Sequence, residues 1–200
     1  MASAAPTAAT RPPRGEARRT LITEAALAVI SRVGPDGLTH RLVATEAGLP
    51  VAATTYWFAS KEDIVCAALE HAAERDLRHL DTVREASRAW TQDTLADELA
   101  GMVQDACTAR REHAVVDYAL WVEALRRPEL RPVARRWIDA YAEFFASVLR
   151  NVGAASTSAD ARLLGAAVDG LISHHLVADG AFDRAAMAAQ LAPLVAAVAG

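Results

Sequence analysis

The sequence has 200 residues, of which 52% are hydrophobic, and a formal net charge of −4. This length suits one or two small domains, and the richness in Ala, Leu and Arg favours helices. No segment sustains β-branched alternation, so we expect an all-α fold without a sheet. The charge is uneven: residues 1–61 carry +3 and the remainder −7. This is compatible with nucleic-acid contact by the N-terminal part and equally with ordinary scatter.

No apolar run marks a signal peptide or a membrane span. The N-terminus lacks the long apolar segment of a signal peptide, and the Ala-rich stretch 185–199 is too short and too weakly hydrophobic to cross a bilayer. The two cysteines, Cys66 and Cys107, fall in predicted helices and are expected to be buried in a reducing compartment, without a disulfide or a metal. We expect a cytoplasmic protein that does not contact a membrane.

The N-terminal residues 1–15 mix Ala, Thr, Pro and Arg without periodicity and are predicted to form a disordered basic tail. An apolar stripe then predicts a first helix over Glu16–Val33, followed by a turn at residues 34–37. Arg18, at the start of this helix, is a candidate phosphate contact. A solvated charged leader is the alternative for the arginines of the tail.

Residues 39–58 have the pattern of a helix-turn-helix. Thr39 is a favourable cap for a short helix, Gly48 can end that helix with φ > 0, and Pro50 suits the first turn of the next helix. In such a unit the second helix lies in the DNA major groove. Any two amphipathic helices joined by a glycine turn look similar, so the spacing alone is weak evidence.

The surroundings of this pattern resemble the N-terminal domain of the TetR/AcrR-like family of bacterial transcriptional repressors. The resemblance spans residues 16–69 and is carried by Thr39, Val43-Ala44, Ala47-Gly48-Leu49, Tyr56-Trp57-Phe58 and Ser60-Lys61-Glu62-Asp63-Ile64. The departures fall on the second helix of the motif: Pro50 replaces a frequent Ser, residues 52–55 replace Gly-x-Leu-Tyr, and Trp57 replaces a frequent His. The operator sequence is therefore not predicted.

The resemblance implies that Val51–Trp57 enters a major groove. The candidate DNA-binding residues are Arg18, Thr39, His40, Arg41, Val51, Ala52, Thr55, Tyr56, Trp57 and Lys61. Thr55, with His40 or Arg41, is the candidate for base contacts, because hydroxyl and guanidinium groups can bond base edges. Most of the others are expected at phosphates, and Lys61 occupies the position of a backbone-contacting lysine in the family.

The remainder of the chain reads as further helices. Ser60 and Asp63 form a predicted capping box for a fourth helix that runs to about Arg84. Four or five helices follow, bounded by caps, glycines and prolines: Asp93–Ala109, His113–Arg126, Pro132–Asn151, Asp160–Asp179 and Asp183–Ala199. Pro193 is expected to kink or shorten the last one. We predict a DNA-binding domain at 16–75 and a C-terminal ligand-binding and dimerisation domain, a helical bundle, at 76–200.

The last two long helices are apolar on more than one face, and such helices must be buried on all sides. We expect a homodimer, since the family pairs through these helices; a monomer with an apolar surface is the alternative. The candidate interface residues are Leu164, Val168, Leu171, Ile172, His175, Met187, Leu191, Leu194 and Val195.

Aromatic residues at helical spacings in the middle of the chain could line a pocket for a small, largely apolar ligand with a polar handle. Plain core packing is the commoner role of such residues, and it stands as the alternative for each of them. The candidates are Trp90, Met102, Tyr118, Trp121, Trp137, Tyr141, Phe144, Phe145 and His174.

Enzymatic motifs find little support. The sequence has no Gly-rich phosphate loop, no Gly-x-Ser-x-Gly elbow and no paired Glu-x-x-His segments of a di-iron bundle. We expect no catalytic residue, cofactor or metal. The predicted function is a ligand-responsive transcriptional regulator, a homodimeric repressor that binds a pseudo-palindromic double-stranded operator and is released by a small molecule. The alternative is a helical sensor or carrier whose N-terminal part contacts proteins.

Overall fold

The computed structural model describes residues 14–178 and 180–199. The predicted tail therefore lies outside the described residues, except for its last two, which begin the first helix. All regular structure in the described part of the chain is helical, which confirms the predicted all-α class. None of the helices described is both long and apolar enough to cross a membrane.

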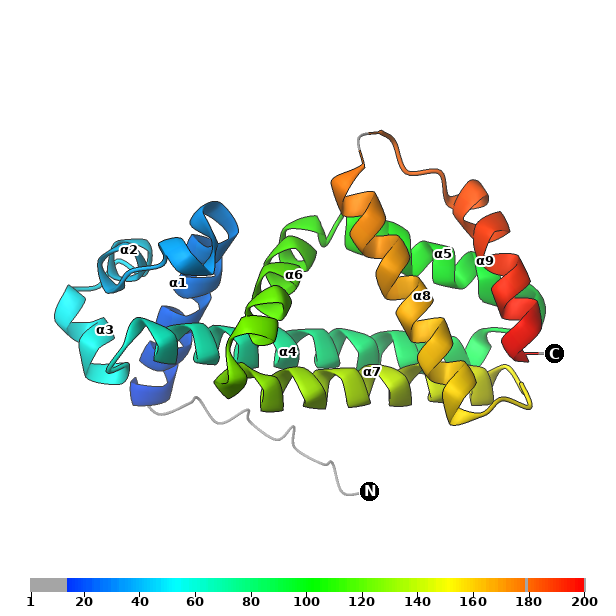
Figure 1. Cartoon of the computed structure of the whole chain (residues 1–200), viewed down its shortest axis with the longest axis horizontal. Helices are drawn as coiled ribbons and strands as arrows, with labels where there is room; N and C mark the ends of the chain where they lie inside the picture. The colour runs from blue at the N-terminus through cyan, green and yellow to red at the C-terminus, as the bar shows by residue number, and fades with distance from the viewer. Residues whose placement is uncertain (1–13, 179, 200) are drawn as a thin grey trace, which may run out of the picture.

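The N-terminal head consists of α1, α2, α3 and the first turns of α4 (Figure 1). α1 (Arg14–Gly37) is interrupted at Gly34, where φ is 72°, so the predicted turn is a kink followed by a short helical continuation. α2 (His40–Glu46) and α3 (Val51–Trp57) form the helix-turn-helix. Gly48, between them, has a φ of 64°, the left-handed conformation that a glycine adopts without strain.

Local capping residues begin the helices of the head where the sequence predicts them. Thr39 caps α2, and its side chain accepts a hydrogen bond from the backbone N–H of Leu42 at 3.2 Å. α4 (Lys61–Ala86) starts with the predicted capping box: Asp63 N–H donates to Ser60 Oγ at 3.1 Å, and Ser60 N–H donates to Asp63 Oδ2 at 2.9 Å. These bonds satisfy amide groups that a helix start leaves free.

The body contains the rest of α4 and five further α-helices (Figure 1). They are α5 (Gln92–Cys107), α6 (Arg111–Arg126), α7 (Arg131–Asn151), α8 (Ser158–Val177) and α9 (Arg184–Ala199), with short 3-10 helices at Ser87–Ala89 and Pro128–Leu130. α9 continues past Pro193 to its end, so the proline does not shorten it. Pro193 is exposed, and water can satisfy the carbonyl that its ring leaves unpaired.

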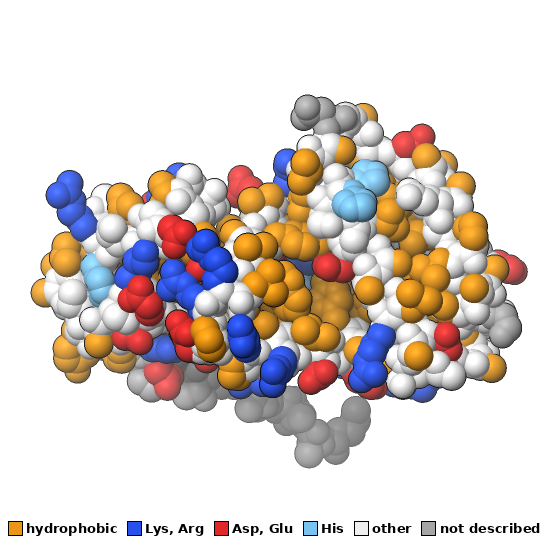
Figure 2. Space-filling view, in the orientation of Figure 1, with side chains coloured by type: hydrophobic (Ala, Val, Ile, Leu, Met, Phe, Trp, Pro, Cys, Tyr) orange, Lys and Arg blue, Asp and Glu red, His pale blue; other side chains and the backbone are white. Residues whose placement is uncertain are grey.

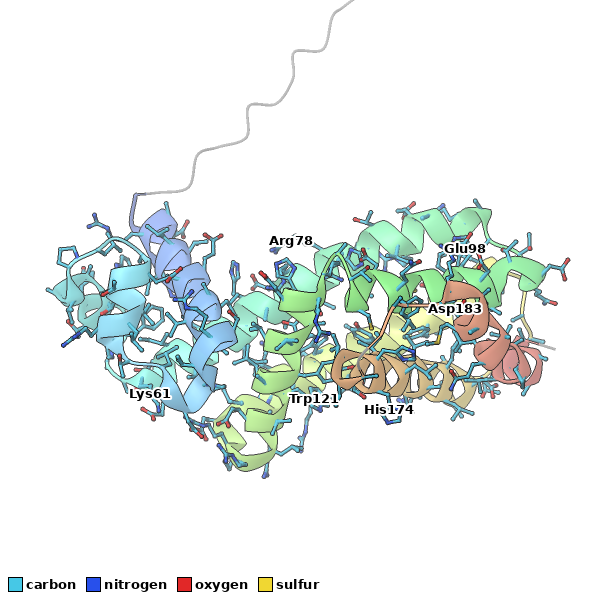
Figure 3. The ribbon with its side chains drawn as sticks, turned by 90° about the horizontal axis from the view of Figure 1, so that it is seen from above. Lys61, Arg78, Glu98, Trp121, His174 and Asp183 are labelled. Carbon is cyan, nitrogen blue, oxygen red and sulfur yellow. The ribbon has the colours of Figure 1, made fainter. Side chains whose placement is uncertain are left out.

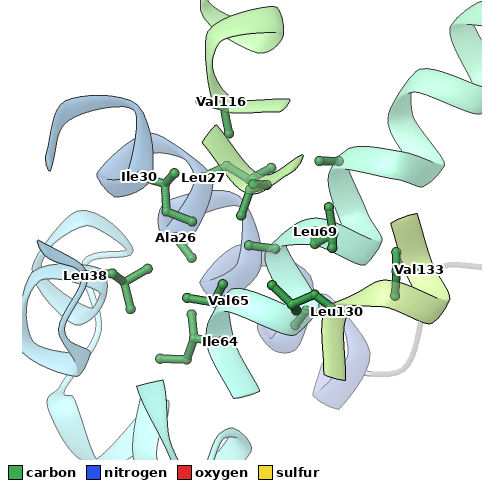
Figure 4. Close-up of a cluster of buried hydrophobic side chains, with 14 of the residues drawn as sticks. Ala26, Leu27, Ile30, Leu38, Ile64, Val65, Leu69, Val116, Leu130 and Val133 are labelled. Carbon is green, nitrogen blue, oxygen red and sulfur yellow. The ribbon is translucent and has the colours of Figure 1, made fainter. Parts of the chain in front are cut away.

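One continuous apolar cluster joins the head to the body (Figure 4). It contains Ala26 and Ile30 of α1, Leu69 of α4, Val116 of α6 and Val133 of α7, all less than 9% exposed. A buried side chain loses contacts when its neighbours move apart. The orientation of the head is therefore coupled to the positions of α4 and α6.

A second cluster fills the body between α5, α7, α8 and α9. It includes six of the nine residues predicted at a dimer interface, each at most 8% exposed: Leu164, Val168, Ile172, Met187, Leu191 and Val195. These side chains are buried inside the chain itself and cannot reach a partner, which corrects the expectation for them. Leu171, His175 and Leu194 are half-buried. The apolar pattern could not distinguish burial within one chain from burial between two.

Candidate DNA-binding head and ligand cavity

The outer surface of the head carries most of the residues predicted to bind DNA. α3 lies at the far end of the molecule from α9 (Figure 1), and on it Tyr56 is 79% exposed and Val51 43% exposed. Ala52, Thr55, Thr39, Arg41 and Arg18 are also exposed. The side chains predicted to contact bases and phosphates are accordingly accessible on α1, α2 and α3 and at the Thr39 cap.

Three of the predicted DNA-binding residues also have partners within the head. His40 Nδ1 lies 3.1 Å from the hydroxyl of Thr54, a fully buried residue of α3. Because that hydroxyl uses its one hydrogen to donate to the Val51 carbonyl at 2.8 Å, it accepts a hydrogen bond from His40. Trp57 is half-buried against the head core. Lys61 Nζ donates to the backbone carbonyl of Asp36 at 2.8 Å; Figure 3 shows where Lys61 lies in the head. The His40 contact joins α2 to α3, and the Lys61 contact joins α4 to α1.

A cavity of about 370 Å³ lies in the body, with walls from α4, α6, α7 and α8. Figure 2 shows a hollow lined mainly by hydrophobic side chains on this face. Four of the nine residues predicted for a pocket line the cavity: Tyr118 and Trp121 of α6, and Trp137 and Tyr141 of α7. The rings of Trp121 and Trp137 meet at 88°, with centroids 6.4 Å apart.

The other five predicted pocket residues do not line this cavity. Phe144 and Phe145 are buried in the body core, and Trp90 and Met102 pack against that core. His174 is exposed on the outer side of α8, away from Trp121 (Figure 3). Because each residue turns a helix by about 100°, Phe144 and Phe145 lie on nearly the same face of α7 as Trp137 and Tyr141, but one to two turns closer to its C-terminus, where they pack into the body core instead of the cavity.

Charged residues that the sequence analysis missed complete the cavity wall. They are Asp76, Arg110, Asp117, Arg162 and Asp169. A signal for two of them was present: Asp76 and Asp117 fall on the apolar stripes of their helices, beside Ala73, Leu80 and Leu120, and both are buried. A carboxylate at such a position needs a partner.

That partner is an arginine in both cases. Arg110 donates to Asp76 Oδ1 at 2.7 Å, and Arg75 donates to Asp117 Oδ1 at 2.6 Å. Burial, together with the nearby negative charge of Asp76, raises the pKa of Asp117 to about 8, while Arg75 acts in the opposite direction. The inner wall thus combines aromatic rings with paired charges. No cluster of three potential metal ligands occurs in the part of the chain that the structure describes.

The last turn of α6 ties the body to the head through a cluster of ion pairs. Glu123 is 4% exposed and accepts hydrogen bonds from Arg126 and Arg127, each at 2.6 Å. The same two arginines reach Asp36 of α1, at 3.0 and 3.4 Å. Arg127 also lies 3.7 Å from Glu62 of α4. We refer to these five residues as the α6 clamp.

Family models match both parts of the chain. Residues 22–68 match a model described as bacterial regulatory proteins, tetR family, and residues 90–200 match one described as tetracyclin repressor-like, C-terminal domain. No curated protein sequence matches the chain.

Solved structures with the same fold cover almost the whole chain. The multidrug binding protein EbrR, complexed with ethidium, is 32% identical, with a TM-score of 0.72 over 92% of this chain and 99% of that one. A TetR-family member, SCO1917 from Streptomyces coelicolor A3, is also 32% identical, with a TM-score of 0.73 over 91% of this chain and 98% of that one. A putative regulator from Saccharomonospora viridis in complex with choline is 22% identical, with a TM-score of 0.70 over 92% and 97% of the two chains, which shows the fold alone.

Proposed function

Because this chain belongs to the TetR family of bacterial regulatory proteins, we propose that it is a repressor that a small molecule releases from DNA. The observation that carries the proposal is the shared use of α4 and α6. Both helices form walls of the 370 Å³ cavity, and both are connected to the head. The EbrR complex with ethidium supports binding of a small molecule by a protein of this fold.

The mechanism that we propose is a displacement of the head by the ligand. A molecule inserted between Trp121 of α6 and Asp76 of α4 would push these helices apart. Packed interfaces respond to such changes by shifting between discrete arrangements. The shift would be transmitted to α1 through the α6 clamp and along α4 to α3. The ligand lowers DNA affinity only to the extent that it binds the displaced state more tightly.

DNA binding in this proposal is dimeric. On its outer face, α8 carries two apolar side chains that the described part of the chain leaves exposed, Leu163 at 55% and Val177 at 86%, both on the same face as Gly170. Exposed apolar surface of this kind marks interfaces. A two-fold dimer would place two copies of α3 in successive major grooves, so the operator is expected to be pseudo-palindromic and the site of action cytoplasmic.

The test is a gel-shift titration of the purified protein on DNA flanking its own gene, followed by random-sequence selection if no complex forms. We expect a discrete complex that survives unrelated competitor DNA and weakens steeply with salt, because phosphate contacts release counterions. Failure of both experiments would contradict DNA recognition. It would favour the alternative of a sensor or carrier whose head binds protein.

A further inference from the structure

The cavity wall contains three carboxylates, and only one of them is not neutralised by the chain. Asp76 and Asp117 each accept a hydrogen bond from an arginine, at 2.7 and 2.6 Å. Asp169 of α8 forms no ion pair with any basic side chain among the described residues. Its carboxylate Oδ1 accepts instead from the hydroxyl of Tyr118, at 2.7 Å. A neutral phenol orients a carboxylate but leaves its negative charge uncompensated.

Asp169 lies on the cavity wall, so its negative charge can interact with a bound ligand. Loss of water around the carboxylate raises its pKa, and the hydrogen bond from Tyr118 opposes that change. An opposite charge is worth more beside a partly desolvated group than in bulk water. A cationic ligand group at Asp169 would therefore be stabilised more than the same group on the open surface.

Arg162 is the other charged residue of α8 on the cavity wall, and it must be weighed against Asp169. It precedes Asp169 by seven residues, about two helical turns or 10 Å along the axis. Both side chains are exposed, but the Tyr118 hydroxyl holds the Asp169 carboxylate at the wall at 2.7 Å, whereas Arg162 forms no hydrogen bond or ion pair within the described part of the chain, so its long side chain can extend into water, where salt screens its charge. Arg110, the remaining basic residue of the wall, is occupied by Asp76. Among the carboxylates of the wall that the structure describes, Asp169 is therefore the one without an arginine partner and is available to pair with a cationic ligand group.

The aromatic walls favour the same kind of ligand. Tyr118 and Trp121 of α6 face a cavity that Trp137 and Tyr141 of α7 also line. Aromatic faces attract cations, tryptophan most strongly, and they also stack on flat rings. The volume of about 370 Å³ is within the range of about 300–1,000 Å³ that is usual for sites of small organic ligands.

We propose that the cavity selects aromatic organic cations and that Asp169 is the residue that binds their positive charge. This inference rests on the proposed function only in placing the effector in this cavity. Direct binding of ligand without DNA tests it independently of repression.

The test uses three fused-ring probes of similar size and different charge. N-methylacridinium is a permanent cation, acridine in mildly alkaline buffer is neutral, and anthracene-9-carboxylate is an anion. Calorimetric titration of the full chain should give the lowest Kd for N-methylacridinium. Asp169→Asn should raise that Kd about tenfold or more, while the Kd for acridine stays within about twofold. Asp169→Glu should retain the preference for the cation.

The matched control is Asp139→Asn, which removes the charge of an exposed aspartate of α7 that does not line the cavity. It should leave all three Kd values unchanged. Equal affinities of the wild type for the three probes, preference for the anion, or no binding of any probe would each overturn the inference. None of these outcomes affects a specific operator complex in the gel shift, so failure of the ligand class is distinguishable from failure of the regulator.

Discussion

The carboxylate of Asp36 accepts a hydrogen bond from Arg126 at 3.0 Å, although ninety residues separate the two in the chain. Asp36 lies in the last turn of α1 in the head, and Arg126 is the last residue of α6 in the body. The Arg126 guanidinium holds the pKa of Asp36 below its usual range, so the carboxylate is charged at neutral pH. The side chains are 70% and 60% exposed, and pairs this exposed add little to stability. We therefore propose that the contact between Asp36 and Arg126 serves to couple movements of the body to the orientation of the head.

Replacement of Asp36 by Asn should weaken this coupling without unfolding the protein. We expect an unchanged melting temperature and unchanged ligand affinity, but a loss of about fivefold or more in the effect of ligand on operator affinity, the lower end of typical coupling energies. Gel-shift titrations with and without ligand measure this ratio. An unchanged ratio in Asp36→Asn, with Asp139→Asn as control, would show that the α6 clamp does not transmit the signal.

Lys61 is expected to exchange its partner when the head binds DNA. In the free protein its ammonium group bonds the Asp36 carbonyl at 2.8 Å, at the positive N-terminal end of α4, where a phosphate is favoured. Lys61→Ala should weaken binding to all sequences and reduce the slope of log K against log salt by about one unit. Lys61→Arg should keep the slope. A slope unchanged in Lys61→Ala would exclude a phosphate contact.

Tryptophan fluorescence should report ligand binding from two of the four tryptophans. Trp121 and Trp137 line the cavity, whereas Trp57 lies in the head and Trp90 packs on the body core. A ligand that does not absorb tryptophan emission should quench the wild type. The double variant Trp121→Phe with Trp137→Phe should lose most of that change. The variant Trp57→Phe should keep it, and quenching lost only there would place the ligand outside the cavity.

A substitution at Gly170 tests the proposed dimer interface without disturbing the fold of the single subunit. A Cβ atom added at this position meets no atom of the described residues within 4 Å. Gly170→Glu should therefore fold, with helix propensity improved over glycine, but it would bury a charge between two copies of α8. We expect sedimentation to show monomers. Ala155→Glu, which adds the same charge to an exposed loop, should remain dimeric, and a dimer in both variants would place the interface elsewhere.

Asp117 predicts a pH dependence of stability. Its pKa is raised to about 8 in the folded protein, above the value of about 3.9 in an unfolded chain. The folded state therefore retains a proton that the unfolded state releases, so this contribution to stability is present at low pH and is lost as pH rises through about 8. The free energy of unfolding should fall between about pH 4 and 8 more steeply in the wild type than in Asp117→Asn. Equal slopes in urea titrations would contradict the shift.

The sequence predicts helix starts and the head well because their determinants are local. Ser60 and Asp63 cap α4 through bonds that span three residues, and Gly48 needs only its own conformation. The division of apolar residues between core, cavity and interface depends on partners far along the chain. Leu163 and Leu164 are neighbours of the same type, yet one is 55% exposed and the other fully buried. The period of the helix alone does not tell which face meets α5, α7 or solvent.

The arrangement of α6 separates two properties along a single helix. Its middle turns, through Tyr118 and Trp121, line the cavity in which we propose that the ligand binds, and its C-terminal end, through Glu123 and Arg127, contacts the head. Substitutions in one half leave the contacts of the other in place. Substitutions at the cavity, in evolution or in the construction of a biosensor, are therefore expected to change which ligand is bound while the contacts between α6 and the head are retained.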